Sequence, residues 1–348
     1  MTVDISIILP VYNAEKWLPA CLASIRDQLV EGFSVEISTF NDGSTDASAS
    51  ILQDWRPVLE AKGFMVTLSN GEEGQPKGVG AAKNAAISRS QGRYLCFQDA
   101  DDEMRPTRLA LQYTAAKKHP TAIIGAQFSR EPPGSTERYT NWANRLSPAQ
   151  LHSQSYTSHG PTVIMPSWFM SRQTYDSVEG GFDETGKGTP EDLIFFYKHL
   201  SAGGRIHRVD EELIVYRYHP DAETFSVLEK TIWDLRMEAI AHEVLSTWNQ
   251  FSIWNAGKQG RKFFRSLSVE NQRKVKCFCD VDPKKINKKF YVYEETDEMP
   301  KPRIPIIHFT QVKPPLILCV KQDLTSGGFE KNLKSMNFQE GQDYFHFN

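Results

Sequence analysis

The chain has 348 residues, of which 40% are apolar, and its net charge is -3 at neutral pH. This length is sufficient for two domains, each with its own hydrophobic core. The small net charge excludes a protein that binds polyanions over its whole surface, so any nucleic-acid site would have to be a local patch.

The five cysteines form no Cys-x-x-Cys pair and lie mostly in apolar runs. This usage favours buried free thiols in a reducing compartment. The first ten residues lack the basic and apolar regions of a signal peptide. No stretch approaches the roughly 18 apolar residues that a membrane span needs. We therefore expect a cytoplasmic protein without a membrane partner.

The N-terminal part alternates short β-branched runs with amphipathic segments. Strands are predicted at residues 5–10, 35–40, 64–69 and 93–98, with helices over 14–29, from Ser44 and from Gly78. Strands that alternate with helices indicate a parallel, doubly wound α/β sheet.

The rest of the chain divides into a mixed region and a second α/β pattern. After the Pro-rich segment 131–134, the pattern predicts helices at 147–154 and 190–200, a strand pair at 206–209 and 213–218, and a long helix from Ser226. Strand patterns recur at 251–254, 275–280, 305–309 and 315–320. We predict one domain over residues 1–247, with halves 1–134 and 135–247, and a smaller Rossmann-like α/β domain over 248–348.

Polar clusters follow the predicted strands at the edge where an open α/β sheet presents its ligand groups. Pro10, Tyr12 and Asn13 follow the first strand, where they hold a base or ribose or simply form a strand-to-helix turn. Asp42 follows the second strand as a candidate acceptor for a base N–H, although this cluster also reads as a helix cap.

The third cluster, GVGAAKN, begins at Gly78 and contains Lys83 and Asn84. Its small residues let a helix N-terminus approach a ligand closely, and Lys83 suits a phosphate or a ribose hydroxyl. Tight packing of the helix on the sheet is the alternative interpretation. The cluster is neither a phosphate loop nor a dinucleotide fingerprint.

The fourth cluster places four acids between residues 99 and 103, directly after an apolar strand. Asp99 and Asp101 are two positions apart on an extended segment, so they point to the same side and can share one cation. Mg²⁺ and Mn²⁺ take such oxygen ligands together with donor phosphates. A solvated loop that caps the next helix explains Asp102 and Glu103 well, but it explains Asp99 and Asp101 poorly.

Two later features add candidates for chemistry. Glu191 and Asp192 open a predicted helix, where the helix dipole favours carboxylates, and Asp192 is the candidate general base. His219 ends a predicted strand and is a candidate nitrogen ligand for the same cation, although a lone histidine is more often structural.

In this order, the segments PVYN, FNDGSTD, GVGAAKN, DAD, GFD with PED, and YRYH resemble family 2 of the GT-A glycosyltransferases over about residues 4–225. The resemblance implies a GT-A fold with a donor half and an acceptor half, a UDP-sugar donor, a divalent cation (Mn or Mg) and inversion at the anomeric carbon. The roles it implies are uracil contacts from Tyr12 and Asp42, ribose and phosphate contacts from Lys83 and Asn84, ribose and metal contacts from Asp99 and Asp101, a base at Asp192 and a metal-side ligand at His219. Lys83 stands where the family more often has arginine.

Longer stretches, including TPEDLIFFYKHL and IWNAGKQGRKFFRSL, resemble transferases that place galactose on the queuosine nucleoside of tRNA. That resemblance implies UDP-galactose as donor and a tyrosine tRNA carrying queuosine as acceptor. The alternatives are an N-acetylglucosaminyltransferase that uses UDP-GlcNAc on a glycan, and a non-catalytic nucleotide- or RNA-binding protein. The residues alone do not choose the donor sugar, which depends on the surroundings of Thr162, Trp168 and Glu191.

The C-terminal domain carries a local basic patch. Residues 258–289 hold eleven bases and three acids, a charge of +8, which favours phosphate contacts over an ordinary solvated face. We expect acceptor or tRNA contacts from Trp168, Lys258, Arg261, Lys262 and Arg265. The segment 255–260 also resembles a dinucleotide fingerprint whose first glycine is Asn255, with Asp280 at the ribose-binding position.

Overall fold

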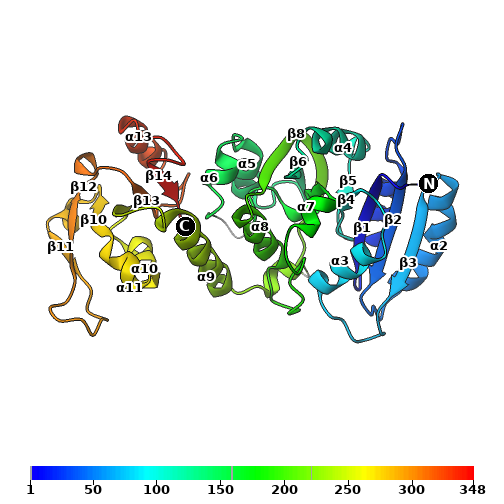
Figure 1. Cartoon of the computed structure of the whole chain (residues 1–348), viewed down its shortest axis with the longest axis horizontal. Helices are drawn as coiled ribbons and strands as arrows, with labels where there is room; N and C mark the ends of the chain where they lie inside the picture. The colour runs from blue at the N-terminus through cyan, green and yellow to red at the C-terminus, as the bar shows by residue number, and fades with distance from the viewer. Residues whose placement is uncertain (1, 158–159, 221) are drawn as a thin grey trace. The chain divides into compact units, whose positions relative to one another are not determined.

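The computed structural model describes residues 2–157, 160–220 and 222–348. The chain forms two compact units. The first contains Met1–Leu151 and Gly160–Ile232, and the second contains His152–His159 and Trp233–Asn348. Each unit is built around its own β-sheet (Figure 1).

The first unit contains an eight-stranded sheet in the order β3-β2-β1-β4-β7-β6-β8-β5. Its strands are β1 Ile5–Val11, β2 Val35–Asn41, β3 Met65–Asn70, β4 Tyr94–Phe97, β5 Glu103–Met104, β6 Ala122–Glu131, β7 Phe169–Ser171 and β8 Arg205–Arg217. Strands β1 to β4 are parallel, β7 is antiparallel to β4 and β6, and β6 and β8 are parallel. Because β7 reverses the direction twice, β6 and β8 point the same way as β4.

Helices cover both faces of this sheet (Figure 1). They are α1 Leu18–Arg26, α2 Ser48–Ala61, α3 Val79–Ser88, α4 Arg108–Lys118, α5 Glu137–Arg145, α6 Gln150–Ser153, α7 Arg172–Asp176 and α8 Glu191–Ser201, with 3-10 turns at Met165–Ser167 and Glu223–Ser226. Alternation in β1 separates the layers: Ile7 packs toward α1 and α2, whereas Ile8 packs toward α3 and α8. The predicted doubly wound sheet is therefore confirmed, with antiparallel β7 inserted and antiparallel β5 at the edge beside β8.

The strand pair predicted at 206–209 and 213–218 is wrong. The structure has one long strand, β8, which pairs with β6 along its length and shifts register at Ala126 and Gln127. The polar residues between the two predicted strands stay extended because the irregular pairing accommodates them without a turn.

The second unit contains a six-stranded sheet in the order β11-β12-β10-β9-β13-β14. Its strands are β9 Phe251–Trp254, β10 Val275–Asp280, β11 Phe290–Val292, β12 Arg303–His308, β13 Leu316–Leu318 and β14 Tyr344–His346. Its helices are α10 Lys258–Ser266, α11 Val269–Arg273, α12 Pro283–Ile286 and α13 Gly328–Ser335, with a 3-10 turn at Phe309–Gln311. All pairs are parallel except β11 with β12, which is a Rossmann-like arrangement.

Helix α9 Glu229–Ile240, which continues into a π turn at Ala241–Leu245, crosses from the first unit into the second. Trp233 Nε1 donates to Ser266 Oγ at 3.0 Å, and Arg236 donates to the carbonyl of Asn348. These contacts place the end of α9 with the C-terminal sheet, so the boundary predicted at residue 248 lies within the second unit.

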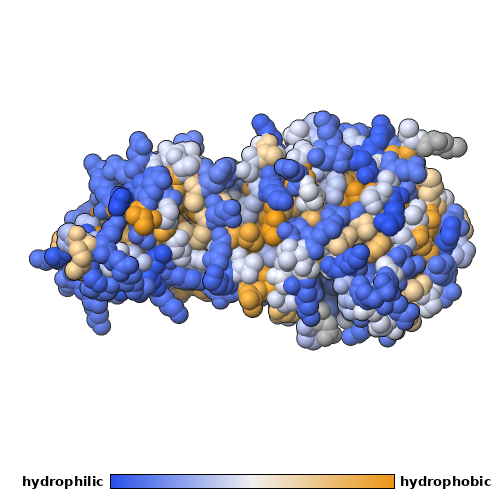
Figure 2. Space-filling model, turned by 60° about the horizontal axis from the view of Figure 1, so that its bottom comes forward, coloured by the Kyte–Doolittle hydropathy of each residue, from blue (hydrophilic) through white to orange (hydrophobic). Residues whose placement is uncertain are grey.

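Hydrophilic residues predominate on the face of the molecule shown in Figure 2, and apolar residues gather there in a few patches. Throughout the described ranges, every helix is too short or too polar to cross a bilayer.

Gly80 allows α3 to pack closely against the segment that leads to α8. A Cβ at this position would lie 2.0 Å from the carbonyl oxygen of Asp183 and 3.3 Å from Cβ of Glu191. We therefore expect Gly80→Ala to lower the free energy of unfolding by about 1–3 kcal/mol, measured by urea denaturation. Gly160→Ala, which meets nothing within 4 Å, is the control. Equal stability of the two variants would contradict this packing.

Candidate active site

The candidate site lies at the carboxyl edge of the first sheet. The segments that follow β1, β2, β4 and β8 all leave the sheet at this edge, because these strands run in the same direction. The N-terminus of α8 contributes Glu191 and Asp192 to the same group of charges, since both carboxylates act electrostatically on Asp99 or on Lys83. Segments far apart in the sequence thus meet at one place.

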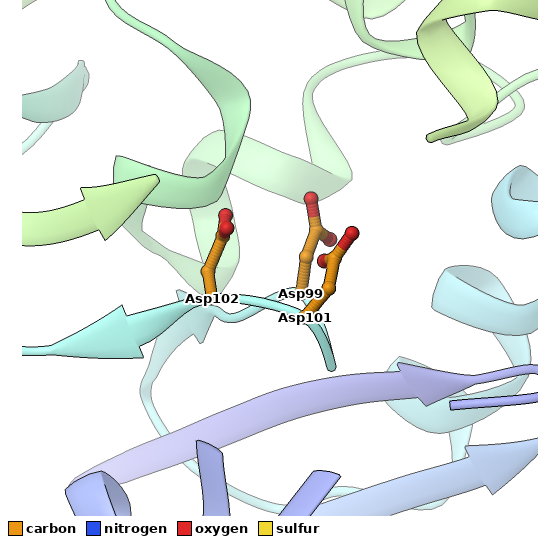
Figure 3. A group of neighbouring side chains, drawn as sticks. All are labelled: Asp99, Asp101 and Asp102. Carbon is orange, nitrogen blue, oxygen red and sulfur yellow. The ribbon is translucent and has the colours of Figure 1, made fainter. Parts of the chain in front are cut away.

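Three aspartates form the acidic centre after β4. One carboxylate oxygen from each of Asp99, Asp101 and Asp102 lies within 4.8 Å of the others. Figure 3 shows the three side chains on the same side of the segment between β4 and β5. Among the described residues, Asp99 Oδ1 and Asp102 Oδ2 are buried and have no hydrogen-bond partner. Buried acceptors without donors are costly, and a hard divalent cation would satisfy them.

The sequence context of Asp102 predicts a solvated helix cap, but the structure does not place Asp102 in one. Its side chain is fully buried, and its Oδ1 accepts a hydrogen bond from the backbone N–H of Arg217 at 2.9 Å. The donor comes from the end of β8, which pairs with β5 immediately after Asp102. The pairing of β5 with β8 therefore buries the Asp102 carboxylate.

Burial disfavours the fully ionised state of the acidic centre. Burial raises the pKa of Asp99 to about 6; the carboxylate of Asp101 adds to the increase, and the ammonium of Lys83 opposes it. The pKa of Asp102 lies well above its ordinary value because of burial and the charges of Asp101 and Asp99. A cation among these oxygens would stabilise the ionised forms of Asp99 and Asp102.

A buried amide and a buried guanidinium hold the backbone of the acidic segment. Gln98 Nε2 donates to the carbonyls of Asp99 at 3.0 Å and Asp102 at 2.9 Å. Arg108 Nη1 in turn donates to Gln98 Oε1 at 2.8 Å, and its Nη2 donates to the carbonyl of Phe97 at 2.7 Å. Because Gln98 and Arg108 are fully buried, the positions of the carboxylates are fixed in advance.

Residues at the end of β8 complete the centre on one side. His219 Nε2 lies 2.9 Å from Asp101 Oδ2, and its Nδ1 is buried without a partner among the described residues. Arg217 Nη1 donates to the carbonyl of Asp101 at 2.8 Å. The ring of Trp17 lies 5.3 Å from that of His219 and 5.1 Å from the guanidinium of Arg217. The structure thus brings His219 to the centre, and its role as a ligand stays a prediction.

The first turn of α8 holds a buried ion pair and a carboxyl with a raised pKa. Lys83 Nζ lies 2.7 Å from Glu191 Oε1, and both side chains are buried. Burial and the charge of Glu191 raise the pKa of Asp192 to about 7, while Lys83 opposes the increase. A carboxylate that ionises near neutral pH is suited to accept a proton from a hydroxyl.

Lys83 and Asn84, which we expect at the ribose and phosphate of the donor, are both engaged with other residues of the chain, and their contacts with a donor stay a prediction. The Lys83 ammonium is directed to Glu191, and the Asn84 amide donates to the Phe182 carbonyl and to Glu184, both at 2.8 Å. Because Gly80 lets α3 approach α8 closely, these side chains connect the two helices. The tight-packing interpretation of GVGAAKN describes them better.

Most of the residues after β1 and β2 are engaged with neighbouring loops of the chain. The Asp42 carboxylate is buried and accepts hydrogen bonds from the N–H groups of Lys77 at 3.0 Å and Gly78 at 2.8 Å. Asn13 Oδ1 accepts from the N–H of Thr45 at 2.9 Å. The Tyr12 ring, by contrast, is 49% exposed and is available to a ligand. Pro10 is buried within β1.

The predicted acceptor contact from Trp168 is wrong. Its side chain is fully buried, and its Nε1 donates to the carbonyl of Val163 at 2.9 Å. The indole packs among Phe182, Phe195 and Phe196 in the core, where no acceptor reaches it. Thr162, also considered for sugar preference, is buried and donates to the carbonyl of Leu151.

The four basic residues expected to contact RNA lie on α10 and differ in exposure. Lys258 is exposed. Arg261 and Lys262 pack over the rings of Tyr291 at 5.1 Å and Trp233 at 3.7 Å, and Arg265 lies 3.6 Å from Glu295.

The polar groups of the degenerate fingerprint after β9 form hydrogen bonds within the chain itself. Asn255 Oδ1 accepts from the N–H of Gly257 at 2.7 Å, and its Nδ2 donates to the carbonyl of Cys319 at 2.8 Å. The Asp280 carboxylate is buried and accepts from the N–H of Ala256 and from Lys285 Nζ, both at 2.9 Å. Asp280 therefore has no free edge toward a ribose.

Comparisons with known proteins relate the chain to glycosyltransferases. Residues 6–178 match the family model described as Glycosyl transferase family 2. The chain is 26% identical to the uncharacterized glycosyltransferase EpsJ of Bacillus subtilis, over 73% of this chain and 72% of EpsJ. It is 34% identical to the poly(ribitol-phosphate) beta-glucosyltransferase of Bacillus spizizenii, over 34% of this chain and 18% of that protein.

Among solved structures, S. aureus TarS 1–349 in complex with UDP-GlcNAc is similar, with a TM-score of 0.53 and 18% identity. The similarity covers 78% of this chain and 72% of that one. Together with the family match, it confirms the predicted GT-A α/β fold.

Asp102 provides a direct test of the acidic centre. If its orphaned oxygen is a ligand, Asp102→Asn lowers the affinity for manganese at least about tenfold, measured by calorimetry in the presence of UDP. Asp27→Asn, which alters an exposed ion pair with Arg26, is the control. Unchanged manganese affinity in the Asp102 variant would show that Asp102 serves only to hold Arg217.

The buried ion pair between Lys83 and Glu191 gives a second test. Lys83→Met should cost about 3–5 kcal/mol in urea denaturation, because Glu191 then stays buried without its partner. Lys83→Met combined with Glu191→Gln should recover much of this stability. Arg56→Met, which removes an exposed pair with Glu60, should cost less than about 1 kcal/mol.

The same double variant separates a pairing role from donor binding. It should bind UDP as the wild type does, because the ammonium is directed to Glu191. A loss of UDP affinity in the double variant would instead restore Lys83 as a phosphate contact.

Proposed function

We propose that this chain, whose residues 6–178 match the model of glycosyl transferase family 2, transfers a sugar from a UDP-sugar to an acceptor hydroxyl with a divalent cation. The observation that carries this proposal is the acidic centre of Asp99, Asp101 and Asp102, in which two buried oxygens, Asp99 Oδ1 and Asp102 Oδ2, lack donors among the described residues. Asp192, whose carboxyl pKa is raised to about 7, acts in the same group of charges. A cation site and a proton acceptor are the two requirements of this transfer.

The three aspartates fit Mg²⁺ or Mn²⁺, which prefer oxygen ligands. Asp99, Asp101 and Asp102 would hold the cation, with His219 beside Asp101. When bound, the cation neutralises the charge that develops on the departing diphosphate. The buried network of Gln98 and Arg108 keeps the carboxylates in place, so that little reorganisation is needed.

Asp192 is the proposed base. Its carboxylate removes the proton of the acceptor hydroxyl as that oxygen attacks the anomeric carbon, and a single displacement of this kind inverts the configuration. Lys83 and Glu191 fix the first turn of α8 and thereby orient Asp192. The exposed ring of Tyr12 after β1 is proposed to stack on uracil.

Transfer of N-acetylglucosamine from UDP-GlcNAc to a glycan acceptor is the donor and acceptor pair that the comparisons favour. TarS of Staphylococcus aureus is a poly(ribitol-phosphate) beta-N-acetylglucosaminyltransferase, and it is 30% identical to this chain over 97 residues. The similar TarS structure contains UDP-GlcNAc.

The second candidate is transfer of galactose from UDP-galactose to queuosine in the anticodon of a tyrosine tRNA, in the cytoplasm. The charge of +8 over residues 258–289, with Lys258 exposed, supports a tRNA acceptor. This candidate is kept beside the first because only an acceptor experiment separates them.

Asp192→Asn distinguishes a catalyst from a nucleotide-binding protein. We expect sugar transfer to fall about 10²- to 10⁴-fold while UDP affinity is retained. In the wild type, kcat/KM should rise with pH up to the pKa of Asp192 near 7, because the base must be ionised. Transfer by the variant at the wild-type rate would remove Asp192 from the mechanism.

The same variant has a stability signature. Because folding raises the pKa of Asp192 to about 7, wild-type stability falls as pH rises between about 4 and 7. Asp192→Asn should be less sensitive to pH in this window, as measured by thermal unfolding without metal.

The donor and acceptor are tested together by mass spectrometry of products. Purified protein with manganese is given UDP-GlcNAc, UDP-glucose or UDP-galactose, and either a ribitol-phosphate oligomer or tRNA with and without queuosine. Added mass of N-acetylhexosamine on the oligomer supports the first candidate, and added hexose only on queuosine tRNA supports the second. No transfer to either acceptor and no hydrolysis of any donor would contradict a glycosyltransferase.

A further inference from the structure

Arg130, at the end of β6, differs from the other arginine at this edge of the sheet. Its Nε is buried and has no hydrogen-bond partner among the described residues. Arg217, one position further along the paired strand β8, forms ion pairs with Glu103 and Glu131. The guanidinium of Arg130 thus remains without a carboxylate in the described part of the chain, although acidic residues lie nearby.

Aromatic rings hold Arg130 instead. Its guanidinium carbon lies 3.8 Å from the ring centre of Tyr216, 5.4 Å from Phe128, and 5.9 Å from each of Tyr139 and Tyr218. We name these five residues the Arg130 cluster. Contacts of this kind use the face of the guanidinium, so its N–H groups can still donate hydrogen bonds to a further partner.

The sheet order places the Arg130 cluster on the acceptor side. The acidic centre follows β4, the residues proposed for the nucleotide follow β1 and β2, and β6 and β8 lie on the opposite side of β4. Burial raises the pKa of Tyr139 to about 12; Arg130 lowers it and the charge of Asp192 raises it. The charges of Arg130 and Asp192 both act on the Tyr139 ring, and the ends of β6 and β8 lie at the same edge of the sheet as the acidic centre.

We propose that the Arg130 cluster binds a phosphodiester group of the acceptor, next to the hydroxyl that receives the sugar. This inference rests on the proposed function and goes beyond it by assigning the acceptor a charge. Both candidate acceptors, a ribitol-phosphate chain and a tRNA, carry phosphodiesters. The guanidinium fork matches two oxygens of such a group.

The surroundings explain why an anionic acceptor needs this arginine. Asp99, Asp101, Asp102 and Asp192 would repel a phosphate at the mouth of the site. Arg130 supplies the opposite charge on the acceptor side, and its charge also lowers the pKa of Asp102. Tyr218 and Phe225, which are 41% and 55% exposed with ring centres 5.7 Å apart, extend the cluster with a surface on which a sugar or base can stack.

The test measures binding of acceptor probes to the full chain with UDP and manganese. The probes are a ribitol-phosphate oligomer, an anticodon stem-loop RNA and phosphate-free ribitol. We expect one phosphodiester probe to bind in a salt-dependent manner and ribitol to bind far more weakly. Arg130→Met should lower the affinity for the phosphodiester probe at least about tenfold, and Arg130→Lys should lower this affinity less. The probe that binds identifies the source of the phosphodiester.

Arg89→Met is the matched control, because Arg89 also packs on a ring, that of Phe40 at 5.3 Å, but on the nucleotide side of the sheet. Equal binding of both phosphodiester probes to wild type and Arg130→Met, or no binding to wild type, would overturn the proposal. A loss of manganese affinity alone would overturn it too, since Arg130 would then only balance the acids. Failure of UDP to bind the wild type with manganese would instead refute the proposed function.

Discussion

Burial of several carboxylates close together is the constraint on which the site depends. Asp99, Asp102 and Asp192 have raised pKa values because burial penalises their charges, and the ammonium of Lys83 offsets only part of this cost. The chain holds the arrangement with fully buried partners far from solvent, chiefly Arg108. Burial of these carboxylates lowers the stability of the fold, and such perturbed groups are common at functional sites.

The sequence predicts the site best where local patterns suffice. Alternating strands and helices establish the parallel sheet, and parallel strands that end at one edge bring Asp101 and His219 together, at 2.9 Å. The burial of Asp102 escapes such reasoning because it depends on the N–H of Arg217, 115 positions later. The pairing of Lys83 with Glu191 spans 108 positions and is equally invisible.

Trp168 and Arg130 also show that local sequence patterns do not predict which side chains are buried in the core. A tryptophan near the acceptor half is a natural candidate for sugar stacking, but the packing of Phe182, Phe195 and Phe196 encloses it. Arg130 carries no motif, and only the ladder between β6 and β8 places it opposite Tyr216. In both cases the register of elements distant in sequence decides whether the side chain faces a ligand or the core.

The raised carboxyl pKa values imply that a cation at the acidic centre would compete with protons. Because burial raises the pKa of Asp99 to about 6, part of the population carries a proton on this carboxyl when the surroundings are mildly acidic. A cation that enters must displace that proton, and its apparent affinity then depends on acidity as well as on its own concentration. With three aspartates as the proposed ligands, occupancy of the centre would depend on both the pH and the cation concentration.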